Sequence, residues 1–197
     1  MNVAVIPAKG KSNRFEGKNL AKIGEHSLLW WTIFYARCNT LIHNVVVSTE
    51  DDRIKREATS ANCMTIERPL GLCGEQPLLD TYTHAYYHLT TKNGMKIDNL
   101  IGLQCDNVDR NIRLDDELQR MKNKRYDMMF SISSNGEPNG AVKIYSSSIL
   151  THGRPYNLGV MIDDCTNIHY ETDMANAIVR IGRTWWYNER YDRQPLA

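Results

Sequence analysis

The sequence lacks a net charge of either sign, because 24 Lys and Arg residues face 23 Asp and Glu residues and leave a formal charge of only +1. Such a balance gives no overall field for a nucleic acid or an anionic membrane. No stripe of basic residues interleaved with aromatic residues is present either. We therefore expect neither nucleic acid nor membrane as a partner, and any anion site must come from a local cluster.

Long apolar runs and paired cysteines are also missing. No apolar run of about 18 residues exists, and the opening MNVAVIPAKG lacks the basic start and long apolar stretch of a signal peptide. The five cysteines are odd in number and contain no C-x-x-C pair, which is typical of reduced thiols rather than disulfides or a zinc site. These absences favour a cytoplasmic protein, and 197 residues most simply form one domain.

Short apolar segments alternate with helical patterns along the chain. The patterns predict strands at residues 3–7, 44–49, 63–67, 99–104 and 128–133, and helices at 27–38, 50–62, 78–89 and 113–122. This alternation predicts an α/β fold, a three-layer sandwich in which helices cover both faces of a mostly parallel, mixed central sheet. Ligands bind beyond the carboxyl ends of such strands, where we expect loops 8–19, 68–77 and 105–112.

The loop after the first strand concentrates positive charge. It reads IPAKGKSNRFEGKN and carries four basic residues against a single acid, Glu16. Gly10 and Gly17 permit turns that bring backbone N–H groups close to a ligand, which suits a polyphosphate. A solvated, lysine-rich surface loop is the competing interpretation. A P-loop is excluded because its first glycine would fall at Val5, and the dinucleotide fingerprint G-x-G-x-x-G also fails.

The same loop resembles the signature I-P-A-R-G-G-S-K-x-x-P-x-K-N of the CMP-sialic acid synthetases (acylneuraminate cytidylyltransferases). Lys9 stands for its arginine, Lys11 for its second glycine and Glu16 for its proline. The segments LWWTIFYA, VVVSTEDDRI, ERP and LLDTYTHAYYHL resemble later family motifs in the same order. Further matches are Leu103-Gln104 to the family's Leu-Gln, and Asn139-Gly140-Ala141 with Tyr145 to its N-G-A-x-Y. The resemblance implies a nucleotidyltransferase fold.

The resemblance also implies a reaction: transfer of CMP from CTP to an acidic sugar (sialic acid, Kdo or a related small acid), with release of pyrophosphate. Lys9 and Lys18 are then the expected catalytic residues, because cations would offset the triphosphate charge and stabilise the leaving group. The expected nucleotide-binding residues are Ala8, Lys9, Gly10, Ser12, Lys18, Asn19, Arg68 and Gln104.

A divalent cation, Mg²⁺ or Mn²⁺, is implied as well, since it would share the charge of the triphosphate. Leu103-Gln-Cys-Asp106 resembles the L-Q-G-D of the related CMP-Kdo synthetases, which makes Asp106 an expected metal ligand. The family's D-I-D-T-x-x-D-L falls on NIHYETDM at residues 167–174, so Glu171 and Asp173 are further candidates, ahead of the pair at residues 163–164. For each of these acids, a solvated surface carboxylate is the alternative.

A long dimerisation insert of the family is replaced by the short SNGEP before Asn139. The sequence thus predicts a single cytidylyltransferase-like domain, residues 1–197, without most of that insert, and it leaves a homodimer open. Nucleotide handling is better supported than sugar handling, and the acceptor could be smaller than a nine-carbon acid. Two alternatives stay open: a nucleotide-binding protein that has lost catalysis, and a nucleotidyltransferase with another base or acceptor.

Some other features have simpler interpretations. His84 and His88 have the spacing of a zinc pair, but Ala85 replaces the glutamate of H-E-x-x-H, so surface or partly buried histidines explain them more simply. In each tryptophan pair, 30–31 and 185–186, we expect one ring in the core and one at its margin. The aromatic, polar stretch 187–193 is either a partner surface or a loose end.

Overall fold

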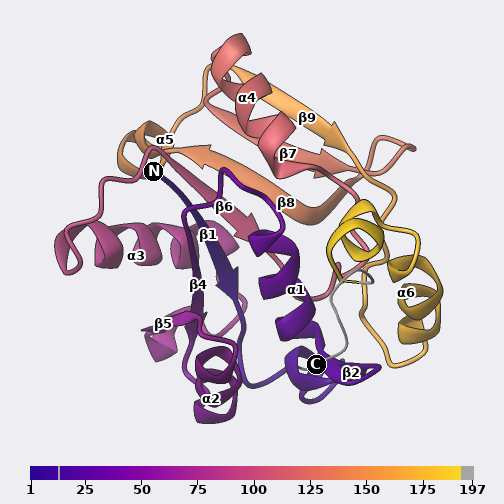
Figure 1. The fold of residues 1–197 in the computed structure, drawn as a ribbon. Helices are drawn as coiled ribbons and strands as arrows, with labels where there is room; N and C mark the ends of the chain where they lie inside the picture. The colour runs from indigo at the N-terminus through magenta and orange to yellow at the C-terminus, as the bar shows by residue number, and fades with distance from the viewer. Residues whose placement is uncertain (13, 192–197) are drawn as a thin grey trace.

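A seven-stranded sheet, in the order β5-β4-β1-β6-β8-β7-β9, forms the centre of the molecule (Figure 1). The computed structural model describes residues 1–12 and 14–191. The strands of this sheet are β1 (Asn2–Pro7), β4 (Asn44–Thr49), β5 (Met64–Glu67), β6 (Asn99–Leu103), β7 (Met128–Ile132), β8 (Pro138–Ser146) and β9 (Leu158–Ile162). A separate short hairpin pairs β2 (Lys22–Ile23) with β3 (His26–Ser27).

The helices alternate with the strands as the sequence patterns predict. The α-helices are α1 (Leu28–Arg37), α2 (Asp52–Ser60), α3 (Leu78–Thr91), α4 (Leu114–Lys124), α5 (Ser147–His152) and α6 (Asp173–Ile181). Short 3₁₀ helices lie at η1 (Lys18–Leu20) and η2 (Leu70–Leu72), and a π-helix at η3 (Tyr187–Tyr191). No helix within residues 1–12 and 14–191 combines the length and hydropathy that a membrane crossing needs.

The strand directions confirm a mostly parallel, mixed sheet. The pairs β5–β4, β4–β1, β1–β6 and β7–β9 are parallel, while β8 runs antiparallel to both β6 and β7. The carboxyl ends of β5, β4, β1 and β6 therefore meet at one edge. The three loops expected to carry a ligand site begin at that edge.

Alternating side chains of the strands face two helical layers. In β1, Ala4 and Ile6 pack in the core cluster that contains residues of α1, α2, α4 and α6, whereas Val3 and Val5 pack in the cluster with residues of α3 and α5. Because both faces of β1 are covered, its sequence is a continuous apolar run. The predicted three-layer sandwich is confirmed.

Two helix starts are fixed by side-chain caps near the candidate site. The Ser27 hydroxyl accepts a hydrogen bond from the N–H of Trp30 (3.0 Å) at the start of α1. At the start of α2, the Asp51 carboxylate accepts from the N–H of Arg53 (2.8 Å) and Ile54 (3.4 Å). These caps satisfy backbone donors that the first helical turn leaves unpaired, and they define the ends of the loops beside β1 and β4.

Several elements were not predicted: β8, β9, α5 and α6 in the second half of the chain, and the β2–β3 hairpin near its start. β8 begins with Pro138 and contains Gly140 and Lys143, which interrupt the apolar pattern of a strand. β9 has the burial pattern of a strand covered on one side only, and its five residues form a short signal. The two tryptophan pairs behave as expected, since Trp31 and Trp186 are buried while Trp30 and Trp185 are half-buried.

Candidate active site

The three predicted loops converge on one cavity of about 230 Å³ beyond the carboxyl ends of β1, β5 and β6. Its basic and amide side chains come from the first two loops and from Gln104 after β6, and two acids, Glu75 and Asp106, lie among them. The lining residues are Pro7, Lys9, Ser12, Lys18, Asn19, Arg68, Leu72, Gly74, Glu75, Gln76, Leu78, Thr81, Gln104, Cys105 and Asp106. Lys9 and Asp106, which are 97 positions apart in the chain, thus share one concave surface.

Lys18 and Asp106 form an ion pair at the wall of this cavity. The Lys18 ammonium lies 2.7 Å from Asp106 Oδ2 and donates a second hydrogen bond to the backbone carbonyl of Ile168 (3.0 Å). The two side chains are only 14% and 15% exposed. Asp106 Oδ1 is buried and has no hydrogen-bond donor in the described part of the chain. An acceptor oxygen in a partly desolvated pocket is chemically suited to a cation.

The first loop is held in shape by its own polar groups. The Asn19 side chain donates to the carbonyl of Lys9 (2.8 Å), and Gly17 precedes η1 with a positive φ of 65°, a conformation that favours glycine. The N–H of Gly10 donates to Glu50 Oε1 (2.7 Å). A Cβ at position 10 would collide with the Asp51 side chain, so this glycine permits the close approach of the loop to the start of α2.

Arg68 is a buried cation without an ion-pair partner among the described residues. Arg68 is only 3% exposed, and its Nη2 donates a hydrogen bond to the carbonyl of Ser48 (3.1 Å). Its Nε has no acceptor within residues 1–12 and 14–191. Burial lowers the pKa of the guanidinium, although nearby Glu50 opposes the shift. A desolvated cation with a spare donor is suited to an anionic or hydroxyl ligand.

Gln104 is positioned from two sides. Its side-chain Nε2 donates to the carbonyl of Gly140 (2.7 Å) at the start of β8, and its own carbonyl accepts from the guanidinium of Arg110. Gly140 has a φ of 74°, and a Cβ there would collide with the Gln104 amide. The predicted Asn-Gly-Ala motif therefore has a physical reason: it lets the strand β8 approach the end of β6.

Four of the predicted residues lie outside the cavity lining. Ala8 is buried in the core and its N–H donates to the carbonyl of Ser48 (3.0 Å), while Gly10 faces the start of α2. Glu171 is exposed. The Asp173 carboxylate accepts from the N–H groups of His169 (2.8 Å) and Tyr170 (2.9 Å) and closes the turn before α6.

The segment that carries the last two acids nevertheless passes the cavity. Its Ile168 accepts from Lys18 and donates its N–H to the carbonyl of Asp106 (2.9 Å). Hydrogen bonds from the backbone of Tyr170 and His169 lower the pKa of Asp173. Neither acid of the pair at 163–164 lines the cavity. The buried Asp163 carboxylate accepts a hydrogen bond from the N–H of Asn111, and the Asp164 carboxylate accepts one from the N–H of Ser134.

The histidine pair, the cysteines and the stretch 187–193 were the other features of the sequence with open interpretations. Within the described residues, no group of three or more His, Cys, Asp and Glu side chains is arranged to hold a metal ion, and this includes the surroundings of His84 and His88. The five cysteines are free. Of the stretch 187–193, the residues up to 191 form η3, whereas 192 and 193 lie outside the described residues.

Sequence reasoning missed two side chains that shape the site, Glu50 and Arg110. Glu50 occupies the N–H of Gly10, and its Oε2 is buried without a donor among the described residues. Arg110 is fully buried, lies 5.0 Å from the centroid of the Tyr35 ring and leaves Nε and Nη1 without acceptors in the described chain. A sequence signal was available: Glu50 directly follows the apolar strand β4, and Arg110 lies in the loop 105–112 that was expected at the carboxyl edge after β6.

A larger cavity, about 880 Å³, lies at the opposite end of the strands. Asn2 and Asn99 at the starts of β1 and β6 line it together with residues of α4, and none of the predicted site residues does. It has no buried, unpartnered polar atom among its described residues. We therefore assign the chemistry to the smaller cavity, where charge and unsatisfied polar atoms coincide.

Comparison with known sequences supports the predicted resemblance. Residues 3–70 match the family model of the cytidylyltransferases. The 3-deoxy-manno-octulosonate cytidylyltransferase of Leptospira biflexa is 44% identical over 52 residues, a match that covers 26% of this chain and 21% of that protein. The chain thus matches only about a fifth of the length of this curated relative. The resemblance to cytidylyltransferases is confirmed over the N-terminal third, which contains the charged loop.

Solved structures resemble this chain over most of its length. A CMP:2-keto-3-deoxy-manno-octonic acid synthetase complexed with CTP superimposes with a TM-score of 0.71 over 92% of this chain and 98% of that chain, at 14% identity. Rv0371c of Mycobacterium tuberculosis in complex with manganese gives a TM-score of 0.63 over 90% and 98% of the two chains, at 11% identity. At such identities the likeness concerns the fold, and it confirms the predicted nucleotidyltransferase fold.

Proposed function

We propose that this protein is a CTP-dependent cytidylyltransferase that transfers CMP to an acidic sugar or a related small acid and releases pyrophosphate. The observation that carries the proposal is the cavity in which Lys9, Lys18 and Arg68 surround Asp106, a carboxylate with an unpartnered oxygen. Three cations at one sheet edge match the charge of a triphosphate. The family match of residues 3–70 and the fold shared with a CTP-bound synthetase support the same activity.

Different polar side chains of the cavity contact different parts of the nucleotide. Gln104 is held by Gly140 through its amide Nε2, which leaves its side-chain oxygen to accept from the exocyclic amino group of cytosine. The spare Nε of Arg68 donates to a ribose or phosphate oxygen. Lys9, Ser12 and Lys18 supply donors to the phosphates from the first loop. Asn19 acts through Lys9, because its amide fixes the backbone of that residue.

A divalent metal ion fits the donor set at Asp106. The unpartnered Oδ1 offers one hard oxygen ligand, and Mg²⁺ commonly takes only one or two protein carboxylates and completes its shell with waters and phosphate oxygens. When bound, such an ion would withdraw charge from the phosphates. The manganese complex of the structurally similar Mycobacterium tuberculosis protein supports a metal in this fold. Glu171 and Asp173 are kept as weaker candidates, since neither lines the cavity.

The chain's own residues position the reactants rather than transfer protons. Lys18 donates to Asp106 Oδ2 and would turn to a phosphate oxygen when CTP is bound, whereas Asp106 Oδ1 is open to a metal ion without that change. The oxygen of the acceptor hydroxyl then forms a bond to the α-phosphorus, the bond from the α-phosphorus to the pyrophosphate oxygen breaks, and the hydroxyl proton passes to water. Cations on the phosphates stabilise the charge that develops on the leaving group. We further propose that residues 1–197 form a single cytidylyltransferase-like domain. We also propose that the protein works in the reducing cytoplasm, because its five cysteines are free thiols.

A second candidate is a nucleotide-binding protein of the same fold that has lost catalysis. The observation that favours it is the absence of any cluster of three metal-ligating side chains in the described chain. The two candidates share the cavity but differ in turnover. They also share the prediction that CTP protects the protein from unfolding.

Pyrophosphate release distinguishes the two candidates. The protein is mixed with Mg²⁺ or Mn²⁺, each of the four nucleoside triphosphates and a panel of sugar acids, and pyrophosphate is followed with time. Turnover with CTP and one acid supports the transferase, whereas saturable CTP binding without turnover across the panel supports the binder. Turnover with another triphosphate but not CTP would refute the assignment of the base. Lys11→Ala serves as the control variant, because Lys11 is an exposed cation of the same loop that does not line the cavity.

A further inference from the structure

Eight buried side-chain polar atoms have no hydrogen-bond partner within residues 1–12 and 14–191, and they form two groups. The first group belongs to the loop after β6 and includes the candidate metal ligand Asp106. The second group comes from the ends of β4 and β5 and from α3, and its atoms are Ser48 Oγ, Glu50 Oε2, Arg68 Nε and His84 Nδ1. Buried polar groups of a stable fold are normally satisfied, so the second group also indicates a position that a ligand completes.

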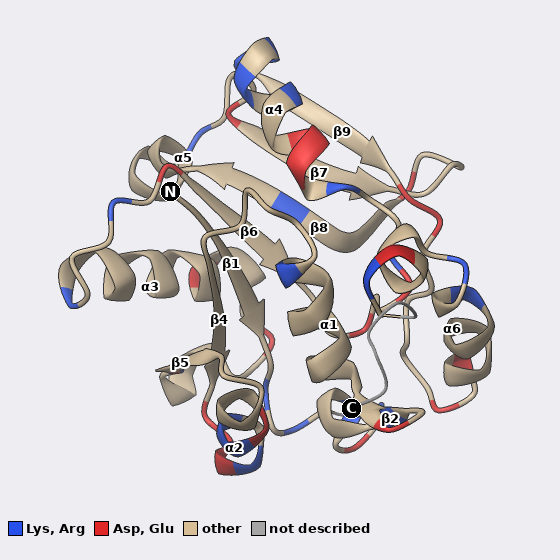
Figure 2. Ribbon diagram, in the orientation of Figure 1, with Lys and Arg blue, Asp and Glu red and all other residues tan. Residues whose placement is uncertain are grey.

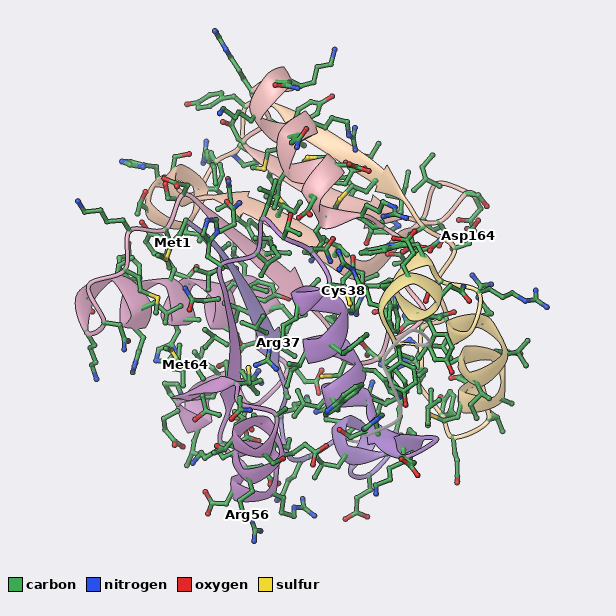
Figure 3. All side chains as sticks on the ribbon, viewed as in Figure 1. Met1, Arg37, Cys38, Arg56, Met64 and Asp164 are labelled. Carbon is green, nitrogen blue, oxygen red and sulfur yellow. The ribbon has the colours of Figure 1, made fainter. Side chains whose placement is uncertain are left out.

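The second group lies on the side of the sheet that α3 covers. Val46 of β4 and Ile66 of β5 pack in the core cluster that contains residues of α3. Ser48 and Arg68 follow them by two positions, so their side chains point to the same side. β5 begins at Met64, which Figure 3 labels, and its last residue directly precedes Arg68.

Glu50 directly follows β4, two residues beyond Ser48, and is held against the first loop. Its Oε1 accepts from the N–H of Gly10 (2.7 Å), whereas its Oε2 is buried and has no donor in the described chain. The N–H of Arg68 donates to the carbonyl of Thr49 (3.0 Å), which brings the residue after β5 beside the residue after β4. Figure 2 shows residues of both signs where these strands end beside α2.

Glu50 and Arg68 have opposite charges that lie near each other without pairing. Burial lowers the pKa of Arg68, and the Glu50 carboxylate opposes this shift. None of the ion pairs within the described part of the chain joins the two side chains. Glu50 has a free acceptor and Arg68 a free donor, both shielded from water. A group that completes both must therefore donate one hydrogen bond and accept another.

The chemistry of this gap selects a hydroxyl group. A phosphate oxygen would satisfy the Arg68 donor, but the Glu50 carboxylate would repel it. An amino group would satisfy Glu50 but would point its hydrogens at the guanidinium. A hydroxyl both donates and accepts through a single oxygen. In CTP the groups of this kind are the 2′- and 3′-hydroxyls of the ribose.

Given the proposed function, on which this assignment rests, we propose that Glu50 and Arg68 bind a ribose hydroxyl of the nucleotide and select a ribonucleotide over a deoxyribonucleotide. The hydroxyl donates to Glu50 Oε2 and accepts from Arg68 Nε. Glu50 is then a specificity-determining residue. Because its other oxygen holds the N–H of Gly10, it also links recognition of the ribose to the loop that contacts the phosphates.

The hydroxyl reaches this gap from the cavity that Arg68 lines. Glu50 does not line the cavity, and Cys73 of the turn after β5 lies beside its carboxylate. Burial raises the pKa of the Cys73 thiol, and the nearby Glu50 carboxylate raises it further. The N–H of Cys73 donates to the carbonyl of Leu70 (3.0 Å) within the same turn, and Leu70 is 81% exposed. We therefore expect this turn to shift outward as a unit and uncover Glu50 Oε2 when the nucleotide binds.

The first test compares ribose with deoxyribose in the native protein. Isothermal titration calorimetry with Mg²⁺ gives the Kd of CTP, 2′-deoxy-CTP and 3′-deoxy-CTP. We expect at least one deoxy nucleotide to bind about tenfold more weakly than CTP, or weaker still, because its binding leaves a buried acceptor and a buried donor unpaired. If both deoxy nucleotides bind within about twofold of CTP, this assignment is wrong and the proposed function stands. If CTP itself does not bind, both are refuted.

The second test uses Glu50→Gln to locate the discrimination. The amide keeps an oxygen for the N–H of Gly10 but turns an N–H group towards the Arg68 donor and the hydroxyl. We expect the ratio of Kd values, rejected deoxy nucleotide over CTP, to fall from tenfold or more to about twofold. If Glu50→Gln weakens CTP and the deoxy nucleotide by the same factor, Glu50 only supports the first loop and the assignment is overturned.

Glu16→Gln is the matched control for this variant. It removes the same charge from an exposed acid of the first loop that does not line the cavity, and the native ratio of Kd values should persist. A ratio that falls equally in both variants would trace the discrimination to net charge and contradict the proposed contact. Thermal unfolding followed by circular dichroism checks that both variants are folded, and the comparison of nucleotides in the native protein needs no variant.

Discussion

Asp106 and Asp109 lie three residues apart in the loop after β6, and both are largely shielded from water, yet their surroundings differ completely. Both carboxylate oxygens of Asp109 have donors: Oδ1 accepts from the N–H of Thr166 (2.9 Å), and Oδ2 accepts from the Thr166 hydroxyl (2.8 Å) and from Arg180 Nε (2.8 Å). Asp106 has Lys18 on one oxygen and no donor in the described chain on the other.

The difference separates a structural acid from a reactive one. Buried polar groups of a stable fold are normally satisfied, so an unsatisfied oxygen beside a cavity indicates a position that a ligand completes. The same contrast holds for the cations: Arg180 is paired with Asp109, whereas Arg68 at the cavity has a spare donor. Predictions for the Asp109 region therefore concern stability, and those for the Asp106 region concern binding and turnover.

The largest effect is expected for Asp109→Ala. Removing this acid leaves the Thr166 donors and the half-exposed Arg180 guanidinium without their acceptor; hydrogen bonds to a charged group contribute about 1.5–3 kcal/mol each, so we expect a loss of about 3–5 kcal/mol of folding free energy. The measurement is urea unfolding. Asp116→Ala is the control, since Asp116 is an exposed acid in the first turn of α4. If both variants lose the same free energy of unfolding, the hydrogen bonds of Asp109 contribute no more to stability than an exposed acid does.

Asp163 should make stability depend on pH. Burial raises its pKa to about 6, against the opposing hydrogen bond from the N–H of Asn111. Below about pH 4 the carboxyl is protonated in both the folded and the unfolded chain; above pH 6 the folded chain must bury its charge. A shift of about two units corresponds to roughly 3 kcal/mol of stability lost as the pH rises through this window.

Asp163→Asn removes that titration, so its stability relative to the native chain should increase by up to about 3 kcal/mol between pH 4 and pH 7. Denaturant unfolding at several pH values measures the difference. The neighbouring Asp164→Asn is the matched control, because Asp164 is exposed. A difference between native and Asp163→Asn that stays constant with pH would contradict the expected titration.

Asp106→Asn should reduce turnover while leaving the fold intact. The amide retains the size of the carboxyl but offers a metal a poorer ligand, and we expect pyrophosphate release to fall about 10- to 100-fold with a higher metal requirement. Initial rates at a series of Mg²⁺ concentrations measure both effects. If the rates and their dependence on Mg²⁺ are unchanged, Asp106 is not a metal ligand of the site.

The smallest effect is expected for Lys18→Ala. Loss of one charge-assisted hydrogen bond to phosphate should weaken CTP binding by about 1.5 kcal/mol, or roughly tenfold in Kd. Isothermal titration calorimetry measures the constant, and Lys11→Ala should leave it within about twofold. Equal Kd values for native and Lys18→Ala would count against the contact with the nucleotide.

Much of the fold could be predicted because the signals are local. The strands 3–7 and 44–49 are short β-branched runs, and α3 has a regular apolar stripe, so their positions agree with the structure within a few residues. β8 and β9 could not be predicted in the same way. Pro138 and Gly140 break the pattern of β8, and the outer side chains of β9 are apolar although they are exposed. Sequence patterns assume that apolar residues are covered.

The candidate site shows the same division. Family resemblance identified Lys9, Lys18, Arg68, Gln104 and Asp106, and all five line the cavity. It also suggested Ala8 and Gly10, which do not line the cavity: Ala8 is buried in the core, and Gly10 lies against the Asp51 side chain at the start of α2. The roles of Glu50 and Arg110 depend on which backbone groups come within hydrogen-bond distance, namely the N–H of Gly10 and the carbonyl of Gln104.

Residue types and their spacing along this chain were enough to specify alternating strands and helices and a basic loop at the edge of a sheet, because both follow from interactions between near neighbours. Pairing across the chain could not be read in that way. Whether an acid is saturated like Asp109 or open like Asp106 depends on Thr166, Arg180 and Lys18, which lie 57, 71 and 88 residues away in the sequence. Only folding brings those groups within 3 Å, and that contact separates the structural acid from the candidate ligand.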